Sequence, residues 1–262
     1  MIDRRGFVLS KSIVTERQRK LIVDELNVTP YVKNPFEDPE PYDVYSQDDD
    51  NYYLPRFWAL EHIDPNPVIN FKYNPNSVAD FAFDKRHLRI NQIDIINTLS
   101  KSYYDENTKT LVPFQGKIIN IGTGMGKTVL ALFMMCFLKR KALIITHTEP
   151  LDTQWFVRIE DYVSNAKIGY IKGTKYKIDG CNIVVAKVQS LMKSSLNLRE
   201  LLKDFDLVIY DEAHHYASRV FSNVLRTLSF QYTISLTATL ERNDRLEKVL
   251  YWFLGDIGYK IE

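Results

Sequence analysis

The sequence predicts an α/β protein built on a parallel sheet with helices on both faces. From about residue 80 onward, short apolar and β-branched runs alternate with helical segments, the pattern of strand–helix–strand units. Several runs are apolar along their whole length, as strands buried on both faces require. The expected strands are 117–121, 142–146, 168–171, 183–186, 207–210 and 233–236, and the expected helices include 128–140 and 152–163.

The composition is that of an ordinary globular protein. Of the 262 residues, 45% are hydrophobic and 26% are charged, which excludes a long disordered chain or a collagen-like repeat. The two cysteines, Cys136 and Cys181, are too few for a disulfide framework or a four-cysteine zinc site. The longest apolar run, 129–138, is about half of the roughly 20 residues that cross a membrane, and the N-terminus lacks a secretion signal. We therefore expect a soluble intracellular protein with no membrane partner.

Charge places a limit on how this chain binds a polyanion. Lysine and arginine number 34 and aspartate and glutamate 33, so the formal net charge is +1. Such a balance creates no overall field that attracts nucleic acid. If the protein binds nucleic acid, a local surface must do so.

Residues 1–80 differ from the rest, and we expect them to form a small mixed α+β accessory domain ahead of a larger domain at 81–262. Thr15 and Gln18 match a capping box, which predicts the start of a helix. Apolar residues at helical spacing follow, and Pro30 ends the pattern.

Other features of this N-terminal part leave alternatives open. Arg17, Arg19 and Lys20 fit a solvated helix face better than a phosphate contact. The proline-rich stretch 35–41 and the acidic stretch 47–50 indicate a solvated loop with room for an edge hairpin, and an acidic arm that mimics nucleic acid is the alternative. The aromatic stretch 52–60 is expected to anchor this part, either internally or on the next domain.

A glycine-rich segment between an expected strand and an expected helix predicts a phosphate-binding loop. Glycines let consecutive backbone N–H groups surround an anion, and the helix N-terminus adds partial positive charge. Lys127 would reach the β- and γ-phosphates, and the Thr128 hydroxyl would bind Mg²⁺. The strict pattern has glycine where Ile121 stands, so we interpret the loop as a variant, against the alternative of a chance glycine turn. The loop comprises Gly122, Thr123, Gly124, Met125, Gly126, Lys127 and Thr128.

Two adjacent carboxylates follow another expected strand. The apolar run 207–210 leads directly into Asp211 and Glu212, which places both acids at the carboxyl edge of the sheet, where α/β proteins bind ligands. An ATPase needs one carboxylate to hold Mg²⁺ and another to orient and deprotonate the attacking water. We assign the first role to Asp211 and the second to Glu212. Alone, the pair would equally fit a helix N-cap.

Four further side chains near strand ends are weaker candidates. His214 and His215 could be metal ligands, but we favour a hydrogen bond from His214 to the next motif over a zinc site. That motif contains Thr237 and Thr239, whose hydroxyls flank an alanine and can face the same direction at strand spacing. An ordinary strand end is the alternative.

Taken in order, these motifs resemble those of superfamily 2 helicases and translocases. The resemblance implies a RecA-like first lobe at 81–262, with ATP and Mg²⁺ as cofactors and His214 among the catalytic residues. Residues 88–92, Leu-Arg-Ile-Asn-Gln, match an upstream signature of this family. The signature adds Arg89 and Gln92 to the ATP-binding residues, and the glutamine recognises adenine. Thr237 and Thr239 would couple nucleotide and nucleic-acid binding.

The resemblance also implies a nucleic-acid surface. Residues 150–155 resemble the first nucleic-acid motif of the family, and 188–191 resemble a later one, although Lys187 stands where that motif often has threonine. For Trp155, packing against the lobe is favoured over base stacking. The contacts would be mainly to phosphates of DNA or RNA and therefore without sequence preference. The residues implied are Thr148, Gln154, Arg158, Gly173 and Gln189.

Residues 236–244 narrow the resemblance to the branch of the xeroderma pigmentosum group B and UvsW-type enzymes. Segments 53–57 and 251–255 are similar to poxvirus-type helicases of large cytoplasmic DNA viruses, which implies a viral factory or host cytoplasm as the site of action. In the family, a second RecA-like lobe supplies arginines to the γ-phosphate. We expect that lobe to be absent from residues 1–262, and because such an arginine is worth about 10³–10⁵ in rate, we expect weak hydrolysis by this chain alone.

Three functional classes therefore remain open. The first is an ATP-dependent helicase or translocase, with the missing lobe and transcription or repair machinery as expected partners. The second is a binding or regulatory module that uses nucleotide as a switch without turnover. The third is a translocase on double-stranded DNA that does not separate strands.

Overall fold

The computed structural model describes residues 1–262 except 35, 37, 72–73, 85–87, 194–196 and 262. The chain divides into two compact units. Unit 1 comprises Met1–Phe71, His214–Ser229 and Leu240–Gly255, and unit 2 comprises Lys72–Ala213, Phe230–Thr239 and Asp256–Glu262. The segments that follow the Asp-Glu pair and the Thr-Ala-Thr motif therefore share a unit with the N-terminal 71 residues.

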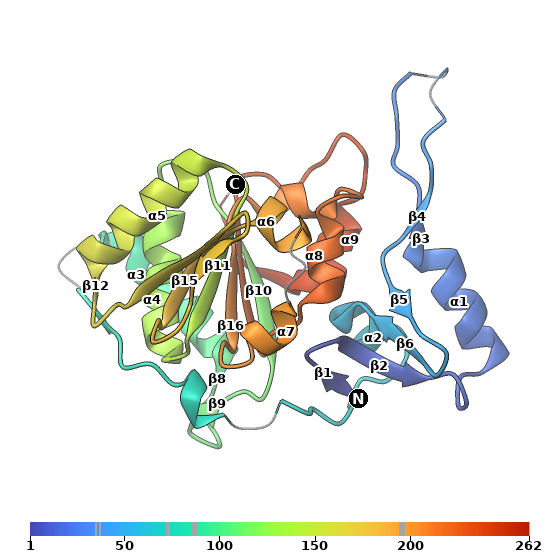
Figure 1. The fold of residues 1–262 in the computed structure, drawn as a ribbon, viewed down its shortest axis with the longest axis horizontal. Coiled ribbons are helices and arrows are strands. Elements are labelled where there is room, and N and C mark those ends of the chain that lie inside the picture. The colour runs from blue at the N-terminus through green and yellow to red at the C-terminus, as the bar shows by residue number, and fades with distance from the viewer. Residues whose placement is uncertain (35, 37, 72–73, 85–87, 194–196, 262) are drawn as a thin grey trace. The chain divides into compact units, whose positions relative to one another are not determined.

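Unit 2 is organised around an eight-stranded sheet in the order β14-β13-β15-β11-β16-β17-β10-β18 (Figure 1). All neighbouring pairs are parallel except β13 and β14, which form an antiparallel hairpin at one edge. The strands are β10 (Gln115–Asn120), β11 (Ala142–Thr146), β13 (Ile168–Lys172), β14 (Lys175–Lys177), β15 (Ile183–Lys187), β16 (Leu207–Tyr210), β17 (Tyr232–Thr237) and β18 (Asp256–Lys260).

Helices cover both faces of this sheet. In Figure 1, α3 (Ile90–Tyr103), α4 (Lys127–Leu138) and α5 (Glu149–Tyr162) lie on one side, and α6 (Val188–Lys193) and α7 (Leu198–Leu201) lie on the other. The core joins β-branched strand residues to α4, whose Leu130, Ala131 and Leu132 are fully buried. The unit also contains two small two-stranded sheets and the short 3₁₀ helix η1 (Pro75–Ser77). One sheet pairs β7 (Ala82–Phe83) with β12 (Val163–Ser164), and the other pairs β8 (Tyr104–Asp105) with β9 (Thr110–Leu111).

The predicted fold class is confirmed. All six expected strands are present, and two of them, 142–146 and 207–210, have the predicted bounds. The sequence did not indicate β14 or β18, because their residues are mostly exposed and lack an apolar pattern. Helix α5 begins earlier than expected, since Pro150 occupies its first turn, where no backbone N–H is required.

Unit 1 contains a four-stranded antiparallel sheet in the order β1-β2-β6-β5. As predicted, Thr15 and Gln18 form a capping box, and it opens α1. The aromatic stretch packs inside this unit, with Trp58 fully buried. The elements are β1 (Ile2–Asp3), β2 (Gly6–Ser10), α1 (Glu16–Leu26), β3 (Asn27–Val28), β4 (Tyr42–Asp43), β5 (Ser46–Gln47), β6 (Asn51–Leu54), α2 (Arg56–His62), η3 (Ala213–Ala217), α8 (Ser222–Thr227) and α9 (Glu247–Leu254). The first residue of η3, Ala213, is assigned to unit 2.

Hydrogen bonds join the separate chain segments of unit 1. The Tyr42 hydroxyl donates to the Ala217 carbonyl oxygen at 2.6 Å, and the Arg226 guanidinium donates to the Tyr45 carbonyl oxygen at 3.3 Å. The Tyr31 N–H donates to the Asp244 carbonyl oxygen at 2.9 Å. Part of the predicted acidic loop, residues 35 and 37, lies outside the described residues.

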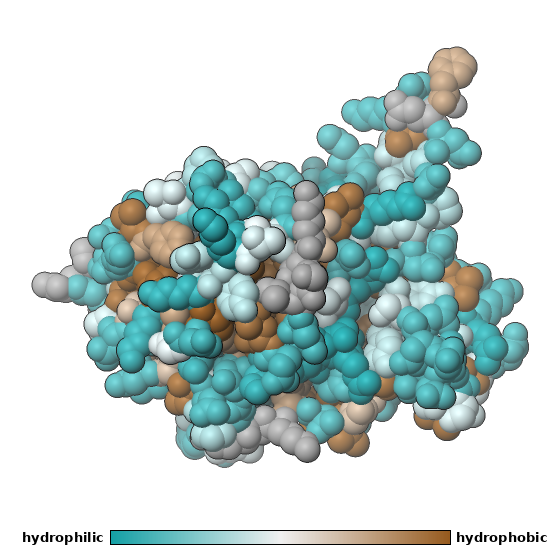
Figure 2. Space-filling view, viewed as in Figure 1, coloured by the Kyte–Doolittle hydropathy of each residue, from teal (hydrophilic) through white to brown (hydrophobic). Residues whose placement is uncertain are grey.

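The face of the molecule shown in Figure 2 is mainly hydrophilic, with hydrophobic side chains in separate patches. Among the described helices, none has both the length and the apolar composition needed to cross a membrane.

The backbone of β14 passes close to Gly169 in β13, and a substitution at Gly169 tests this packing. A Cβ atom there would lie 2.1 Å from the Lys177 carbonyl oxygen and 2.9 Å from the Cys181 Sγ atom. We expect Gly169→Ala to lower the free energy of unfolding by about 1–3 kcal/mol in urea denaturation. Gly122→Ala is the control, because its Cβ would meet only Met125 Cγ, at 3.8 Å. Equal stability of the two variants would contradict the observed packing of β13 on β14.

Candidate nucleotide-binding site

Parallel register brings the predicted motifs to one edge of the unit 2 sheet. In β10 and β17, Asn120 is the partner of Thr237, and in β16 and β17, Tyr210 is the partner of Ser235. The three strands therefore end close together at their carboxyl ends. The glycine-rich loop follows β10, the Asp-Glu pair follows β16, and the Thr-Ala-Thr motif begins at the end of β17.

The glycine-rich loop is shaped for the close approach of another side chain. Gly126 precedes α4 as its N-cap in the left-handed region, with φ 86°, and Gly124 has φ 80°. A Cβ atom at Gly126 would lie 2.2 Å from Gln92 Nε2. Glycine is required here for both reasons, since other residues rarely adopt this φ and would collide with Gln92.

Gln92 and Arg89 contact the backbone of this loop. The Gln92 Nε2 donates to the Met125 carbonyl oxygen at 3.3 Å, and its Oε1 accepts from the Arg89 N–H at 2.9 Å. The Arg89 guanidinium donates to the Gly124 carbonyl oxygen at 3.2 Å. Gln92 is buried in this arrangement, with 2% of its surface exposed. It thus supports the loop in this structure, and the predicted contact with adenine would require its amide to exchange partners.

The other predicted loop residues are accessible to an anion. Gly122, Thr123 and Gly124 are exposed, and Lys127 and Thr128 at the start of α4 are half-buried. The Lys127 ammonium donates to the Ile121 carbonyl oxygen at 3.2 Å. A cation beside a glycine-rich turn at a helix N-terminus is a site where a phosphate group can replace the carbonyl as its partner.

Asp211 lies in a desolvated position that is held from two sides. The Trp155 indole Nε1 donates to Asp211 Oδ2 at 2.8 Å, and the Glu212 N–H donates to Asp211 Oδ1 at 3.0 Å. Burial raises the pKa of the Asp211 carboxyl above its ordinary value, although the Trp155 hydrogen bond and the Lys127 charge act in the opposite direction. Glu212 has φ 48°, a left-handed conformation that is costly for this residue type and typical of functional sites.

These groups fit a magnesium ion. Mg²⁺ prefers oxygen ligands and usually keeps several waters while it binds one or two carboxylates and substrate phosphates. Asp211 provides a buried carboxylate whose desolvation a cation would offset, and Thr128 provides a hydroxyl at the start of α4. Bound Mg²⁺ would neutralise negative charge on the phosphates. Within the described part of the chain, no group of three or more histidine, cysteine, aspartate or glutamate side chains could hold a metal.

The remaining motif residues are placed in different ways. His214 belongs to unit 1, where its carbonyl oxygen accepts from the Arg242 guanidinium. Its ring contacts that of His215 at 4.1 Å between centroids, with the two planes tilted by 39°. Thr237 is buried, and its hydroxyl donates to the Thr239 carbonyl oxygen at 2.5 Å, whereas Thr239 is exposed. The two hydroxyls therefore do not face the same way, because β17 ends at Thr237 and a turn follows.

Of the predicted nucleic-acid residues, Thr148, Gly173 and Gln189 follow the carboxyl ends of β11, β13 and β15. Thr148 is the exposed N-cap of α5, and Gln154 is exposed on the same helix. Arg158 lies further along α5 with its guanidinium 5.8 Å from the centre of the Tyr162 ring. Gly173 is the turn after β13, and Gln189 in α6 donates to the His147 carbonyl oxygen at 3.1 Å.

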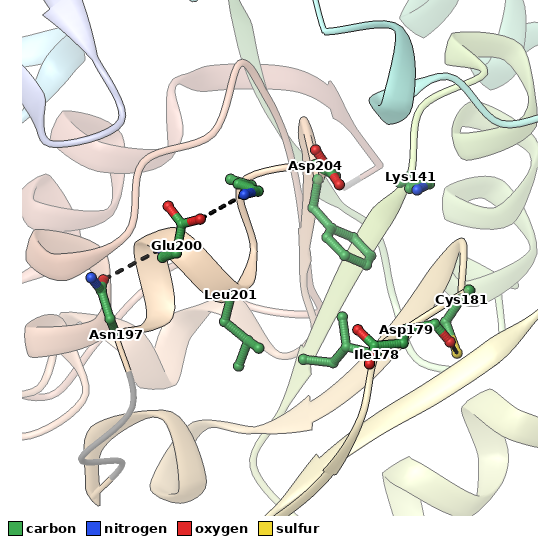
Figure 3. Close-up of a pocket in the computed structure, with 11 residues that line it drawn as sticks. Lys141, Ile178, Asp179, Cys181, Asn197, Glu200, Leu201 and Asp204 are labelled. Atoms are coloured by element: carbon green, nitrogen blue, oxygen red, sulfur yellow. Dashed lines mark hydrogen bonds and ion pairs between the residues drawn. The ribbon is translucent and has the colours of Figure 1, made fainter.

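A separate pocket of about 390 Å³ lies at the other end of the strands, their amino ends (Figure 3). Lys141 and Asp204 from its lining precede β11 and β16, so the pocket faces the amino ends of these strands. Several of its polar groups pair with one another, such as Lys203 with Glu200 at 2.6 Å. It is therefore distinct from the glycine-rich loop.

Comparison with known protein families matches residues 85–242 to the family described as Type III restriction enzyme, res subunit. The match covers more than half of the chain and includes the glycine-rich loop, Asp211 and Thr237. The chain belongs to this family. Its members share a helicase-type domain, which confirms the resemblance to superfamily 2 helicases.

Relatives of this res-subunit domain occur in viruses and cells. The chain is 28% identical over 270 residues to a protein of Acanthamoeba polyphaga mimivirus provisionally named ATP-dependent RNA helicase L396, covering 98% of this chain and 48% of that protein. It is 31% identical over 160 residues to the DNA 3'-5' translocase XPB2 of Sulfurisphaera tokodaii, covering 61% of this chain and 35% of the translocase. The chain therefore spans about half or less of the length of these relatives.

A solved structure supports the fold of the res-subunit domain. The SWI2/SNF2 ATPase core of Sulfolobus solfataricus, solved in complex with double-stranded DNA, matches with a TM-score of 0.50 and 18% identity. The match covers 70% of this chain and 38% of that one. The resemblance at this level concerns the RecA-like fold alone.

The hydrogen bond from Trp155 to Asp211 was not evident from the sequence. Replacing Trp155 tests how this bond affects the Asp211 carboxyl. Trp155→Phe keeps an aromatic ring but removes the donor to Asp211, which should lower the free energy of unfolding by about 1–3 kcal/mol at neutral pH. Losing the donor raises the pKa of Asp211 in the folded protein further above its unfolded value. The deficit should therefore grow as pH rises from about 4 toward neutrality in urea denaturation.

Trp58→Phe is the matched control. Trp58 is also fully buried, and its indole Nε1 donates at 2.7 Å to Glu25, whose side chain is 38% exposed, so water can replace the lost donor. Equal deficits in the two variants, with the same pH profile, would contradict a specific role of Trp155 at Asp211.

Proposed function

We propose that this chain is the nucleotide-binding lobe of an ATP-dependent superfamily 2 helicase or translocase. The observation that carries the proposal is the convergence of Lys127, Asp211 and Glu212 at one edge of a parallel sheet, where Lys127 is close enough to affect the pKa of Asp211. A decayed or purely structural site would not need this combination of an exposed glycine-rich loop, a cation and two carboxylates.

In this proposal each group has one task. The backbone N–H groups of the loop and the Lys127 ammonium bind the β- and γ-phosphates of ATP. Asp211 and Thr128 hold Mg²⁺, and Trp155 fixes the orientation of the Asp211 carboxylate. Glu212 orients the attacking water and accepts its proton. Arg89 and Gln92 set the loop conformation, and Gln92 could turn to adenine when nucleotide binds.

We infer that turnover depends on nucleic acid and on a second RecA-like lobe. The matched parts make up only 48% and 35% of these two relatives, which leaves room for such a lobe in them. Arginines supplied across a cleft accelerate phosphoryl transfer by about 10³–10⁵, so residues 1–262 should bind ATP well and hydrolyse it slowly. DNA or RNA would bind along the sheet edge beside Thr148, Gln154 and Gly173.

Removing the loop cation tests nucleotide binding. We expect Lys127→Ala to weaken the binding of a fluorescent ATP analogue at least 100-fold, because charge-assisted contacts to two phosphate groups are lost. Lys101→Ala, an exposed lysine on α3, is the control and should retain wild-type affinity. Unchanged affinity in Lys127→Ala would show that the nucleotide binds elsewhere.

Glu212→Gln separates binding from chemistry. The amide is nearly isosteric but cannot accept the proton of the attacking water, so hydrolysis measured by phosphate release should fall about 10²–10⁴-fold while ATP affinity changes little. The measurement is made with nucleic acid present and with a relative's second lobe added. If wild type and Glu212→Gln show the same rate under every condition, a binding module without turnover would be the better description.

A further inference from the structure

The β13–β14 hairpin at the sheet edge carries a local excess of positive charge. Residues 167–178 contain four lysines and no carboxylate, although the whole chain has a net charge of only +1. All four lysines are exposed. This hairpin is therefore a local surface of the kind that a nearly neutral protein needs in order to bind a polyanion.

The register of the hairpin sorts its side chains between two faces. Tyr170 is the partner of Lys177, and Lys172 is the partner of Lys175, so these four side chains share one face because opposite residues in a sheet project the same way. Tyr176 is the partner of Ile171, whose side chain is buried. Tyr176 therefore projects to the other face, although it is 47% exposed at the edge.

The lysine-rich face adjoins the carboxyl ends of the strands, the end of the sheet at which the glycine-rich loop lies. The turn of the hairpin follows the carboxyl end of β13, and the Gly173 N–H donates to Ser190 Oγ at 2.8 Å. The Lys172 ammonium pairs with the carboxylate of Glu149, the first residue of α5. Both partners are exposed, and such ion pairs are weak and screened by salt, so a phosphate group can displace Glu149 from Lys172.

We propose that the hairpin face formed by Tyr170, Lys172, Lys175 and Lys177 binds single-stranded nucleic acid. The lysines contact successive phosphates, and Tyr170, 39% exposed among them, stacks on an unpaired base. This proposal rests on the proposed function. It adds β13 and β14, which no helicase motif identifies, to the surface that binds nucleic acid. Lysines on an edge strand also prevent pairing with other sheets, but that role requires no aromatic residue on the same face.

The test measures the affinity of the full 262-residue chain for (dT)20 and (rU)20 between 50 and 200 mM salt. With about 0.7 counterions released per phosphate contact on a single strand, Lys175→Gln with Lys177→Gln should reduce the slope of log affinity against log salt by about 1.4. Affinity at 50 mM salt should fall about 10- to 60-fold. Lys20→Gln with Lys101→Gln removes the same charge from exposed helix surfaces and should leave the slope unchanged.

The two tyrosines form an internal control for stacking. Tyr170→Leu should weaken binding to the single strands about fivefold or more without changing the salt slope, whereas Tyr176→Leu should stay within about twofold of wild type. Neither variant should affect binding to a blunt duplex, whose bases are already stacked. Dependence on the hairpin with only one of the two oligonucleotides would still support the site and would identify the sugar that it accepts.

The outcomes separate this inference from the proposed function. If the wild-type chain binds neither oligonucleotide at 50 mM salt, the nucleic-acid part of the proposed function fails together with the hairpin. If wild type binds but the double lysine variant keeps its salt slope, or Tyr176→Leu weakens binding as much as Tyr170→Leu, the hairpin assignment alone is wrong.

Discussion

The in-register parallel pairing of β10, β17 and β16 is the constraint on which the candidate site depends. Parallel strands end at a common edge, so the segments that follow them meet there even though they lie far apart in sequence. The loop after β10 and Asp211 after β16 are separated by more than 80 residues, and register alone brings them into electrostatic contact.

Much of this arrangement could be predicted because its signals are local. Residues 142–145 and 207–210 are apolar throughout, so these two buried strands were evident. The glycine-rich loop was recognisable since backbone conformation and anion binding demand particular residue types at fixed spacing. The edge strand β14, with the sequence Lys-Tyr-Lys, carries no such signal, because an exposed strand at an edge has no core to match.

The contacts that tune the site could not be predicted, because they join residues through the tertiary fold. Nothing in the sequence indicates that Trp155 donates to Asp211 or that Gln92 packs over Gly126, although both residues lie in recognisable motifs. The turn that separates Thr237 from Thr239 likewise depends on where β17 ends. Unit 1 is likewise assembled from distant chain segments. The hydrogen bonds of Tyr42 with Ala217 and of Arg226 with Tyr45 each join residues more than 170 positions apart in the sequence.

Hydrogen exchange of the 262-residue chain, with and without Mg²⁺ and a non-hydrolysable ATP analogue, tests the central claim most directly, because it locates the bound nucleotide without relying on turnover. The account predicts slower amide exchange in residues 122–130 and around Asp211 when both ligands are present. Protection at the amino-end pocket beside Lys141 and Asp204, or no protection at saturating ligand, would contradict it.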